Sequence, residues 1–343
     1  MRVAMYYSNN DVRIEEMPLP EIGPGEILVR VMASGICGSD VLEWYRINRV
    51  PLVLGHEIAG TIEKAGAHVK GLKNGDRVAV SHHVPCNKCH YCLSGHETVC
   101  ETLRKTNFYP GGFAEFVNIP AINIEQDGVY ILPEEVSFEE ATFIEPLACV
   151  IRGQRLSGIW KGRTVLVIGS GISGLLHIQH ARMLGAKSVV ATDISEYRLE
   201  AAKRFGADSV FDGRDYSPER FRKINGGLLA DVVILCAGAR SAVGQALDSV
   251  ERGGTVLFFA AAEKDLALPK PINDIFWRTE VSLTSSYAAT PREHLEALEA
   301  IRARKINVRD MITHRFGLAQ AGEGFRLVAA ASDSIKVVIE PQK

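Results

Sequence analysis

Residues 164–174, Thr-Val-Leu-Val-Ile-Gly-Ser-Gly-Ile-Ser-Gly, are the stretch that decides the fold. Its first half is an apolar run, which is typical of a parallel strand covered on both faces. Its second half has the spacing Gly-x-Gly-x-x-Gly and is followed by a helical pattern to Leu184 and a second strand pattern that ends at Asp193. A strand, a glycine turn, a helix and an acidic residue 24 positions beyond Gly169 together predict a dinucleotide at the helix N-terminus.

The candidate cofactor residues belong to this turn and to the end of the next strand. Asp193 is expected to accept the two adenosine ribose hydroxyls, and its charge would repel a 2′-phosphate, which favours NAD over NADP. Arg198, five residues later, can approach a phosphate, but it must reach back, so we expect the repulsion to dominate. The full predicted set is Gly169, Gly171, Ile172, Ser173, Gly174, Asp193 and Arg198.

Beyond Asp193 the alternation of helix and strand continues. A helix is expected over residues 195–205, and strands are expected over residues 209–211, 230–236, 254–260 and 281–285. Six parallel strands with intervening helices describe a doubly wound sheet. The tail is predicted to contain helices at 294–304 and 319–331, a turn at 313–316 and a strand at 335–339. Periodicity does not assign this tail to a domain.

The first 125 residues have a different character. Short alternating runs separated by proline and glycine turns predict antiparallel β structure, with functional residues on the turns. A capping-box pattern at Ser137 then begins a helix that we expect to continue through Ile151, with an interruption at Pro146. At 343 residues the chain is long enough for two hydrophobic cores.

A metal site is indicated by Gly55-His56-Glu57, which places an imidazole next to a carboxylate. Such a tripeptide alone is more often a turn with a solvated carboxylate. Here Cys37 lies upstream and Glu145 follows in an apolar segment, where a bare buried charge is costly unless it is paired or bound to metal. Cys37, His56, Glu57 and Glu145 therefore predict an open zinc site, with one or both glutamates as ligands. Alternatively, Glu145 caps the helix after a bend.

Four of the seven cysteines form a second candidate metal site. They follow the spacing Cys-x2-Cys-x2-Cys-x7-Cys, and a tight cluster with an odd total favours metal over disulfides. Four thiolates on a loop suit a closed structural zinc; an iron–sulfur cluster and unligated thiols are the alternatives. The predicted ligands are Cys86, Cys89, Cys92 and Cys100.

Composition excludes several partners. The 39 basic and 41 acidic residues give a formal charge of -2, so nothing indicates a nucleic-acid or membrane-surface partner. The sequence has no apolar run of membrane-spanning length and no signal-peptide pattern at its start, so we expect a cytoplasmic protein.

These motifs, in this order, resemble the medium-chain, zinc-dependent alcohol dehydrogenases over essentially the whole chain. Glu145-Pro146-Leu147 makes the resemblance closest to the sorbitol and polyol dehydrogenase branch. The resemblance implies an α/β protein with a GroES-like, β-rich catalytic domain (1–150 and 286–343) and a Rossmann domain (151–285). It also implies two zinc ions per chain and assembly as a homodimer or homotetramer, for which the apolar run 254–262 is a candidate pairing strand.

Three positions depart from the family pattern. Leu42 stands where many relatives have histidine after Ser-Asp-x, so the role of that histidine is in doubt. In the glycine motif, Ile172 stands where many members of the family have proline, while all three glycines of the motif are present. Arg152 stands where sorbitol dehydrogenases commonly have histidine. We interpret it as a surface or interface residue; the alternative is contact with a substrate oxygen or with the cofactor.

The resulting hypothesis is reversible hydride transfer between a secondary alcohol, of polyol or sugar-like type, and NAD. The catalytic residues would be Ser39, Glu57 and Glu145, with the Ser39 hydroxyl passing the proton outward. Threonine-like or simple secondary alcohols are alternative substrates. Two other classes compete: a non-catalytic NAD- and zinc-binding scaffold or sensor, and a zinc hydrolase, for which the dinucleotide motif would be superfluous.

Overall fold

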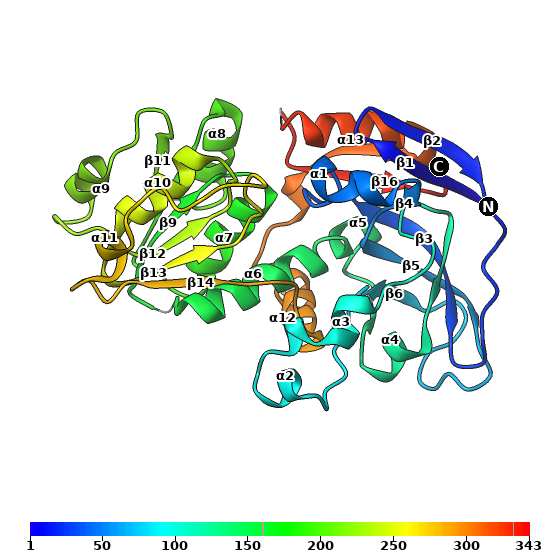
Figure 1. Cartoon of the computed structure of the whole chain (residues 1–343). Helices are drawn as coiled ribbons and strands as arrows, with labels where there is room; N and C mark the ends of the chain where they lie inside the picture. Colours follow the sequence, from blue (N-terminus) through cyan, green and yellow to red (C-terminus); the bar gives the residue numbers. More distant parts are fainter. Residues whose placement is uncertain (160, 332) are drawn as a thin grey trace. The chain divides into compact units, whose positions relative to one another are not determined.

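The computed structural model describes residues 1–159, 161–331 and 333–343. The chain divides into two compact units, one made of Met1–Ala148 with Ala288–Lys343 and the other of Cys149–Tyr287. Both chain ends belong to the first unit, as the colours from blue to red in Figure 1 show. Each unit has its own sheets and its own core, so each is described separately.

The second unit is a six-stranded parallel sheet in the order β11-β10-β9-β12-β13-β14. This order confirms the predicted doubly wound fold, because the chain reverses its direction of travel between β9 and β12. The strands are β9 (Thr164–Ile168), β10 (Ser188–Asp193), β11 (Ser209–Asp212), β12 (Ala230–Leu235), β13 (Val250–Phe258) and β14 (Ser282–Ser285). The helices are α7 (Ile172–Met183), α8 (Glu196–Arg204), α9 (Pro218–Ile224), α10 (Arg240–Ser249) and α11 (Ile272–Phe276).

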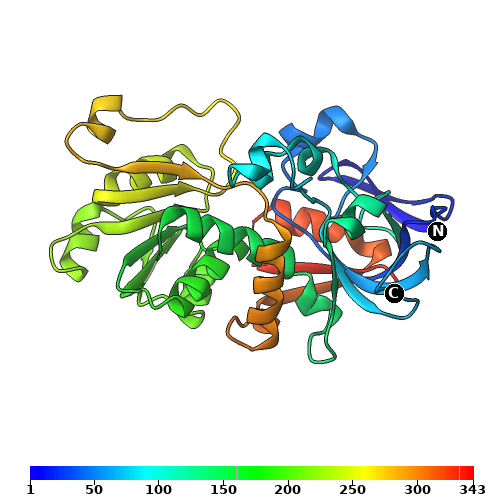
Figure 2. The ribbon, with the colours of Figure 1, turned by 90° about the horizontal axis from the view of Figure 1, so that it is seen from below.

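The core of this unit explains why its strands are apolar along their whole length. All five residues of β9 are buried, because helices cover both faces of the sheet. Phe221 of α9, Val243 of α10 and Ile275 of α11 pack against Leu166 and Val233 on one face. Figure 2 shows green helices of this unit along the other side of the strands.

The first unit is rich in β structure. Its sheets are β2-β1-β4 and a seven-stranded sheet in the order β15-β16-β3-β5-β6-β8, with β7 paired to β3. The strands are β1 (Arg2–Ser8), β2 (Asp11–Glu16), β3 (Ile27–Gly35), β4 (Leu52–Val53), β5 (Glu57–Ala65), β6 (Arg77–Val80), β7 (Phe116–Ile119), β8 (Val129–Ile131), β15 (Ile312–Gly317) and β16 (Lys336–Glu340). The α-helices are α1 (Glu43–Arg46), α2 (His90–Leu93), α3 (Glu101–Lys105), α4 (Ala121–Glu125), α5 (Phe138–Ala141), α12 (Pro291–Arg302) and α13 (Ala321–Ala329), and α6 (Ile144–Ser157) continues into the second unit. Short 3-10 helices are η1 (Ile47–Arg49), η2 (Glu97–Val99), η3 (Arg309–Met311) and η4 (Leu318–Gln320).

The tail belongs to the first unit because its apolar side chains complete that unit's core. Phe325 of α13 packs against Tyr6 and Phe113, with ring centroids 5.4 and 5.3 Å apart. Strand β16 pairs antiparallel with β3, where Val338 lies opposite Gly35. Burial of α13 and β16 against β1 and β3 therefore fixes a placement that periodicity could not assign.

Three sequence expectations are wrong. The predicted turn at 313–316 lies in strand β15, whose polar side chains are tolerated because this strand is at the edge of the sheet. The expected helix from Ser137 breaks at Thr142 rather than after Glu145: Pro146 lies in the first turn of α6, where its missing N–H removes no helical hydrogen bond. Strand β13 cannot pair across a two-fold axis, because β12 and β14 flank it.

Two helical glycines give a matched test of close packing. A Cβ at Gly174 in α7 would overlap the carbonyl oxygen of Gly169, whereas a Cβ at Gly244 in α10 would meet only Pro269 at 3.9 Å. We expect Gly174→Ala to lower the free energy of unfolding by about 1–3 kcal/mol through overpacking. Gly244→Ala should leave it unchanged or raise it by up to about 1 kcal/mol, because alanine favours helix. Urea denaturation followed by circular dichroism measures both; equal effects would contradict this packing.

Candidate active site and metal centres

The sheet register brings the first metal cluster together. Strand β3 ends at Gly35, which pairs with Glu57 at the start of β5. Cys37 follows the first strand and His56 precedes the second, so both lie at the same end of the sheet. One ligand atom from each of Cys37, His56 and Glu57 lies within 4.8 Å of the others. A thiolate, an imidazole and a carboxylate at this spacing suit a zinc ion that keeps an open position.

Asp40 orients the histidine. Its fully buried carboxylate lies 3.4 Å from His56 Nδ1 and accepts a hydrogen bond of 3.0 Å from the backbone N–H of Cys37. Burial alone would lower the pKa of His56, but the Asp40 carboxylate and the Cys37 thiol raise that pKa well above its ordinary range. With Nδ1 directed at Asp40, the other ring nitrogen is left for a metal, an arrangement that raises the basicity of a ligating histidine.

A buried ion pair fixes Glu57. The Lys336 side chain is fully buried, its ammonium group contacts Glu57 Oε2, and it lies 5.3 Å from the centre of the Phe143 ring. Gly35 lies against this pair, and a Cβ there would overlap both the Glu57 carboxylate and the Lys336 ammonium group. Any side chain at Gly35 would therefore displace the carboxylate from the metal cluster.

Glu145 and Ser39 lie outside the three-residue cluster. Glu145 is in the first turn of α6 and lines a small cavity together with Glu57. It is therefore placed near the cluster's carboxylate but does not complete the ligand set in this arrangement. Ser39 follows Cys37 and donates its backbone N–H to the Cys37 sulfur at 3.5 Å, so the geometry fixes its backbone.

Sequence reasoning missed three residues of this site. Asp40 follows Cys37 by three residues, and this short spacing is a signal in the sequence that could have identified it. Lys336 begins β16 between Ile335 and the apolar residues 337–339, and a charge in such a run indicates a buried partner. His82 packs its ring against His56 with centroids 4.8 Å apart and follows strand β6, but nothing in its local sequence marks it.

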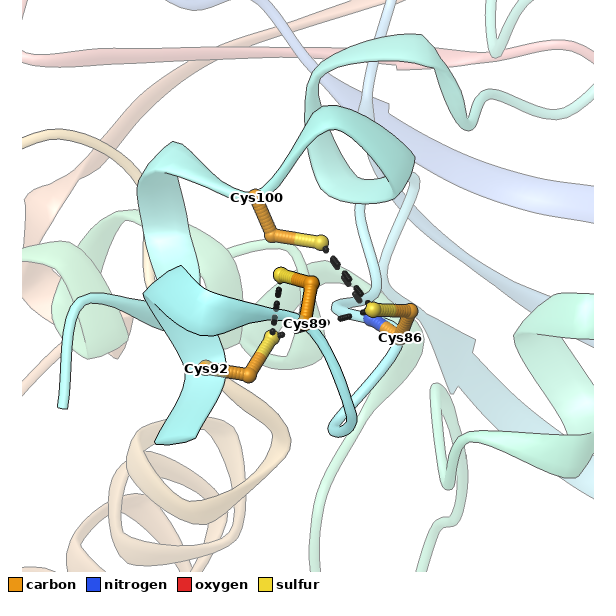
Figure 3. A group of neighbouring side chains, drawn as sticks. All are labelled: Cys86, Cys89, Cys92 and Cys100. Atoms are coloured by element: carbon orange, nitrogen blue, oxygen red, sulfur yellow. Dashed lines mark hydrogen bonds between the residues drawn. The ribbon is translucent and has the colours of Figure 1, made fainter. Parts of the chain in front are cut away.

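The four cysteines of the second candidate metal site converge, as Figure 3 shows. The distances between sulfur atoms are 3.5 Å for Cys86–Cys100, 3.6 Å for Cys89–Cys92 and 4.0 Å for Cys86–Cys92. A tetrahedral zinc with bonds of about 2.3 Å requires sulfur separations of about 3.8 Å, so the cluster has the size that zinc needs. Burial opposes ionisation, but backbone N–H groups, that of Cys86 foremost, lower the pKa of Cys100 to about 6.

The glycine turn of the second unit has the form that a dinucleotide needs. Gly169 has a φ of +93°, and a Cβ there would lie 3.0 Å from the backbone of Cys236. Ile172 and Ser173 begin α7, so their N–H groups belong to the positive end of that helix. Arg198 lies close to the turn, with its guanidinium 3.8 Å from where a Cβ of Gly171 would be.

Asp193 ends strand β10, as the turn motif requires. One carboxylate oxygen accepts the N–H of Ser170 at 2.7 Å and the other accepts the N–H of Ser195 at 2.9 Å. A carboxylate has about four acceptor positions, so two remain for ribose hydroxyls.

Arg152 differs from its sequence interpretation. It lies in α6 and is only 8% exposed, so the expectation of a surface residue is wrong.

Within the described residues, no helix has the length and apolar character needed to cross a membrane.

A Cys-His-Glu cluster in one unit and a dinucleotide turn on a doubly wound sheet in the other define a metal-dependent dehydrogenase. Residues 23–126 match the family described as alcohol dehydrogenase GroES-like domain, and residues 173–303 match that described as zinc-binding dehydrogenase. The sorbitol dehydrogenase of Macaca fascicularis is 34% identical over 92% of this chain and 89% of its own length. The chain belongs to the medium-chain, zinc-dependent alcohol dehydrogenase family, in its polyol dehydrogenase branch.

Solved structures agree over the full length. The galactitol-1-phosphate dehydrogenase of Escherichia coli is 29% identical, has a TM-score of 0.86 and is covered to 100%, with 99% of this chain aligned. A zinc-binding dehydrogenase of Sinorhizobium meliloti bound to NADP is also 29% identical, with a TM-score of 0.87 and 99% of each chain aligned.

Proposed function

We propose that this protein oxidises a secondary alcohol of polyol or sugar-like type and reduces NAD, in a reversible, zinc-dependent reaction. The observation that carries the proposal is the convergence of Cys37, His56 and Glu57, with Asp40 directed at the histidine. The family is one of alcohol and polyol oxidoreductases, and the sorbitol and galactitol-1-phosphate dehydrogenases named above support a polyol. The hypothesis of a non-catalytic scaffold has no support, since the sequence has the expected residue at every predicted metal-ligand position and at all three glycines of the turn.

The residues present fit a catalytic zinc. Cys37, His56 and Glu57 would hold it, and Glu145 is the candidate additional ligand. A zinc ion bound there supplies a Lewis acid for the alcohol oxygen. Asp40 keeps the His56 ring in position, and Lys336 holds the Glu57 carboxylate at the sheet end. NAD, which the glycine turn and Asp193 would hold, would supply the acceptor for the carbon-bound hydrogen as hydride.

The hydroxyl proton needs its own route. Ser39, two residues from Cys37, is the proposed residue that takes the proton and passes it on, because a hydroxyl can accept one proton while donating another. Leu42 occupies the position of the relatives' histidine, so the route beyond Ser39 differs from theirs.

A substrate screen tests the reaction class. Polyols, polyol phosphates, cyclitols, threonine and simple secondary alcohols are incubated with NAD or NADP, and reduced cofactor is followed by its absorbance. We expect the highest kcat/KM for a polyol or polyol phosphate. If only threonine or simple secondary alcohols are turned over, the proposed substrate class is wrong and one of these replaces it. If no alcohol is turned over, the proposed reaction is contradicted.

Metal analysis tests the proposal of two zinc ions per chain. Cys100→Ser should reduce the zinc content to about one and lower stability, because the loop loses the metal that orders it. Cys37→Ser should also lower zinc to about one, but with stability retained and activity abolished. One zinc ion in fully active wild-type protein would contradict the scheme, and iron in the Cys100 site would favour an iron–sulfur cluster.

We base the proposed preference for NAD on the negative charge of Asp193. Asp193→Ala should shift the ratio of kcat/KM values toward NADP by roughly 1–3 kcal/mol, as for charged groups in a partly solvated site. Because alanine also removes the bonds to Ser170 and Ser195, Asp193→Asn is the matched control: it removes the charge and keeps an acceptor oxygen. A wild-type preference for NADP would mean that Arg198 outweighs Asp193.

We further propose a homodimer or homotetramer. Strand β14 is one of the two edge strands of the sheet in the second unit, and the exposed apolar side chains of Leu283, Phe276 and Trp277 belong to β14 and the adjoining α11 segment. A second copy pairing there would bury both the strand edge and these side chains. Sedimentation velocity at micromolar concentration tests this, and a monomer would contradict it.

A further inference from the structure

We propose that the first unit contains a built site for one buried water molecule, which links the Glu57 carboxylate to Tyr130 of β8 and His294 of α12. These two side chains would then be positioning residues for the metal cluster. The site itself depends only on this unit's core; its effect on the metal rests on the proposed function, because it acts through Glu57.

The site is a small cavity in the first unit. Its volume is about 10 Å³, which is the space that the centre of one water molecule needs. Four of its lining residues carry polar groups: Glu57, Tyr130, Glu145 and His294. The others are apolar side chains of β5, β6, α5 and the start of α6. A cavity of this size with two to four polar partners meets the requirements for one ordered water molecule.

His294 offers a buried acceptor to this cavity. Its Nδ1 lies 2.8 Å from the carbonyl oxygen of Thr290, and a carbonyl can only accept, so Nδ1 carries the proton and donates it. Nε2 is therefore a bare lone pair in the neutral ring. The residue is 2% exposed, and Nε2 has no hydrogen-bond partner among the described residues. Burial lowers the pKa of His294 to about 4, which keeps the ring neutral.

Tyr130 offers a buried hydroxyl to the same cavity. Its ring stacks on that of His294, with centroids 5.3 Å apart and planes 8° from parallel. Tyr130 is 3% exposed, and its Oη atom has no hydrogen-bond partner in the part of the chain that the structure describes. Leaving a buried polar group without a hydrogen-bond partner is costly, because the group loses its bonds to water. Two such groups lining one cavity indicate a shared partner.

One water molecule satisfies all three groups. It accepts a hydrogen bond from the Tyr130 hydroxyl, donates one to His294 Nε2, and donates its second hydrogen to the Glu57 carboxylate. Lys336 contacts Oε2 of that carboxylate, so the water would complete its support. A metal ion fits less well, because His294 belongs to neither of the ligand clusters found in the described residues. Partners behind metal ligands typically change metal affinity 10- to 100-fold.

A crystal structure of the zinc-loaded wild-type enzyme is the first test. We expect density for one water molecule within hydrogen-bond distance of Tyr130 Oη, His294 Nε2 and the Glu57 carboxylate. A dry cavity, or a direct hydrogen bond from Tyr130 to His294, would overturn the site. Neither result depends on turnover of any alcohol, so failure of this inference is separable from failure of the proposed function.

Variants test the positioning role. Tyr130→Phe removes only the hydroxyl, and Tyr7→Phe is the matched control, because that hydroxyl bonds Glu15 on β2 instead. Zinc affinity by chelator competition should fall on the order of 10-fold in Tyr130→Phe. The absorption spectrum of the cobalt-substituted enzyme should shift as well. Tyr7→Phe should change neither.

The histidine gives a second pair of variants, which is useful if Tyr130→Phe does not fold. His294→Gln keeps an acceptor near Nε2, and His294→Leu removes it, while both lose the bond to Thr290. We expect weaker zinc binding and an altered cobalt spectrum in His294→Leu, with partial recovery in His294→Gln. Identical zinc affinities and cobalt spectra in the variants and the wild type would overturn the positioning role, even with the water present.

Discussion

The buried ion pair between Lys336 and Glu57 is the interaction on which the catalytic unit depends. Taking two charges out of water is costly even when they pair, but removing one partner costs far more, because it leaves an uncompensated buried charge. Lys336 lies on β16, 279 residues after Glu57, and reaches it through the pairing of β16 with β3. The tail must therefore return to the first sheet before the metal cluster has its final form.

The same sheet end shows how a fixed backbone controls a reactive site. Gly35 leaves room for the ion pair, Asp40 holds the ring of His56, and neither residue is itself a metal ligand. Because strand pairing fixes these groups, a zinc ion would find its ligands already arranged, and little order would have to be gained on binding. The proposed water behind Glu57 would extend this support to α12.

The cysteine loop has the opposite design. Its small cluster joins Cys92 and Cys100 with Leu103, and few apolar side chains support it. The proposed structural zinc would supply its order, which would explain why four cysteines are gathered in 15 residues while the proposed catalytic ligands are spread along the chain. In the second unit, the Asp193 carboxylate accepts hydrogen bonds from the backbone N–H groups of Ser170 and Ser195. It thereby supports the glycine turn and still has acceptor positions for ribose hydroxyls.

The sequence by itself determined the doubly wound sheet, the four-cysteine cluster and the Cys37, His56 and Glu57 group, because each has a local pattern of period, spacing or glycine geometry. Only the tertiary structure decided the strand at 312–317, the helix break at Thr142 and the roles of Lys336, Tyr130 and His294. These depend on which strand lies at an edge, on burial and on contacts between residues far apart in the chain. No short stretch of sequence records such contacts, because their energies arise only when distant segments exclude water from the same space.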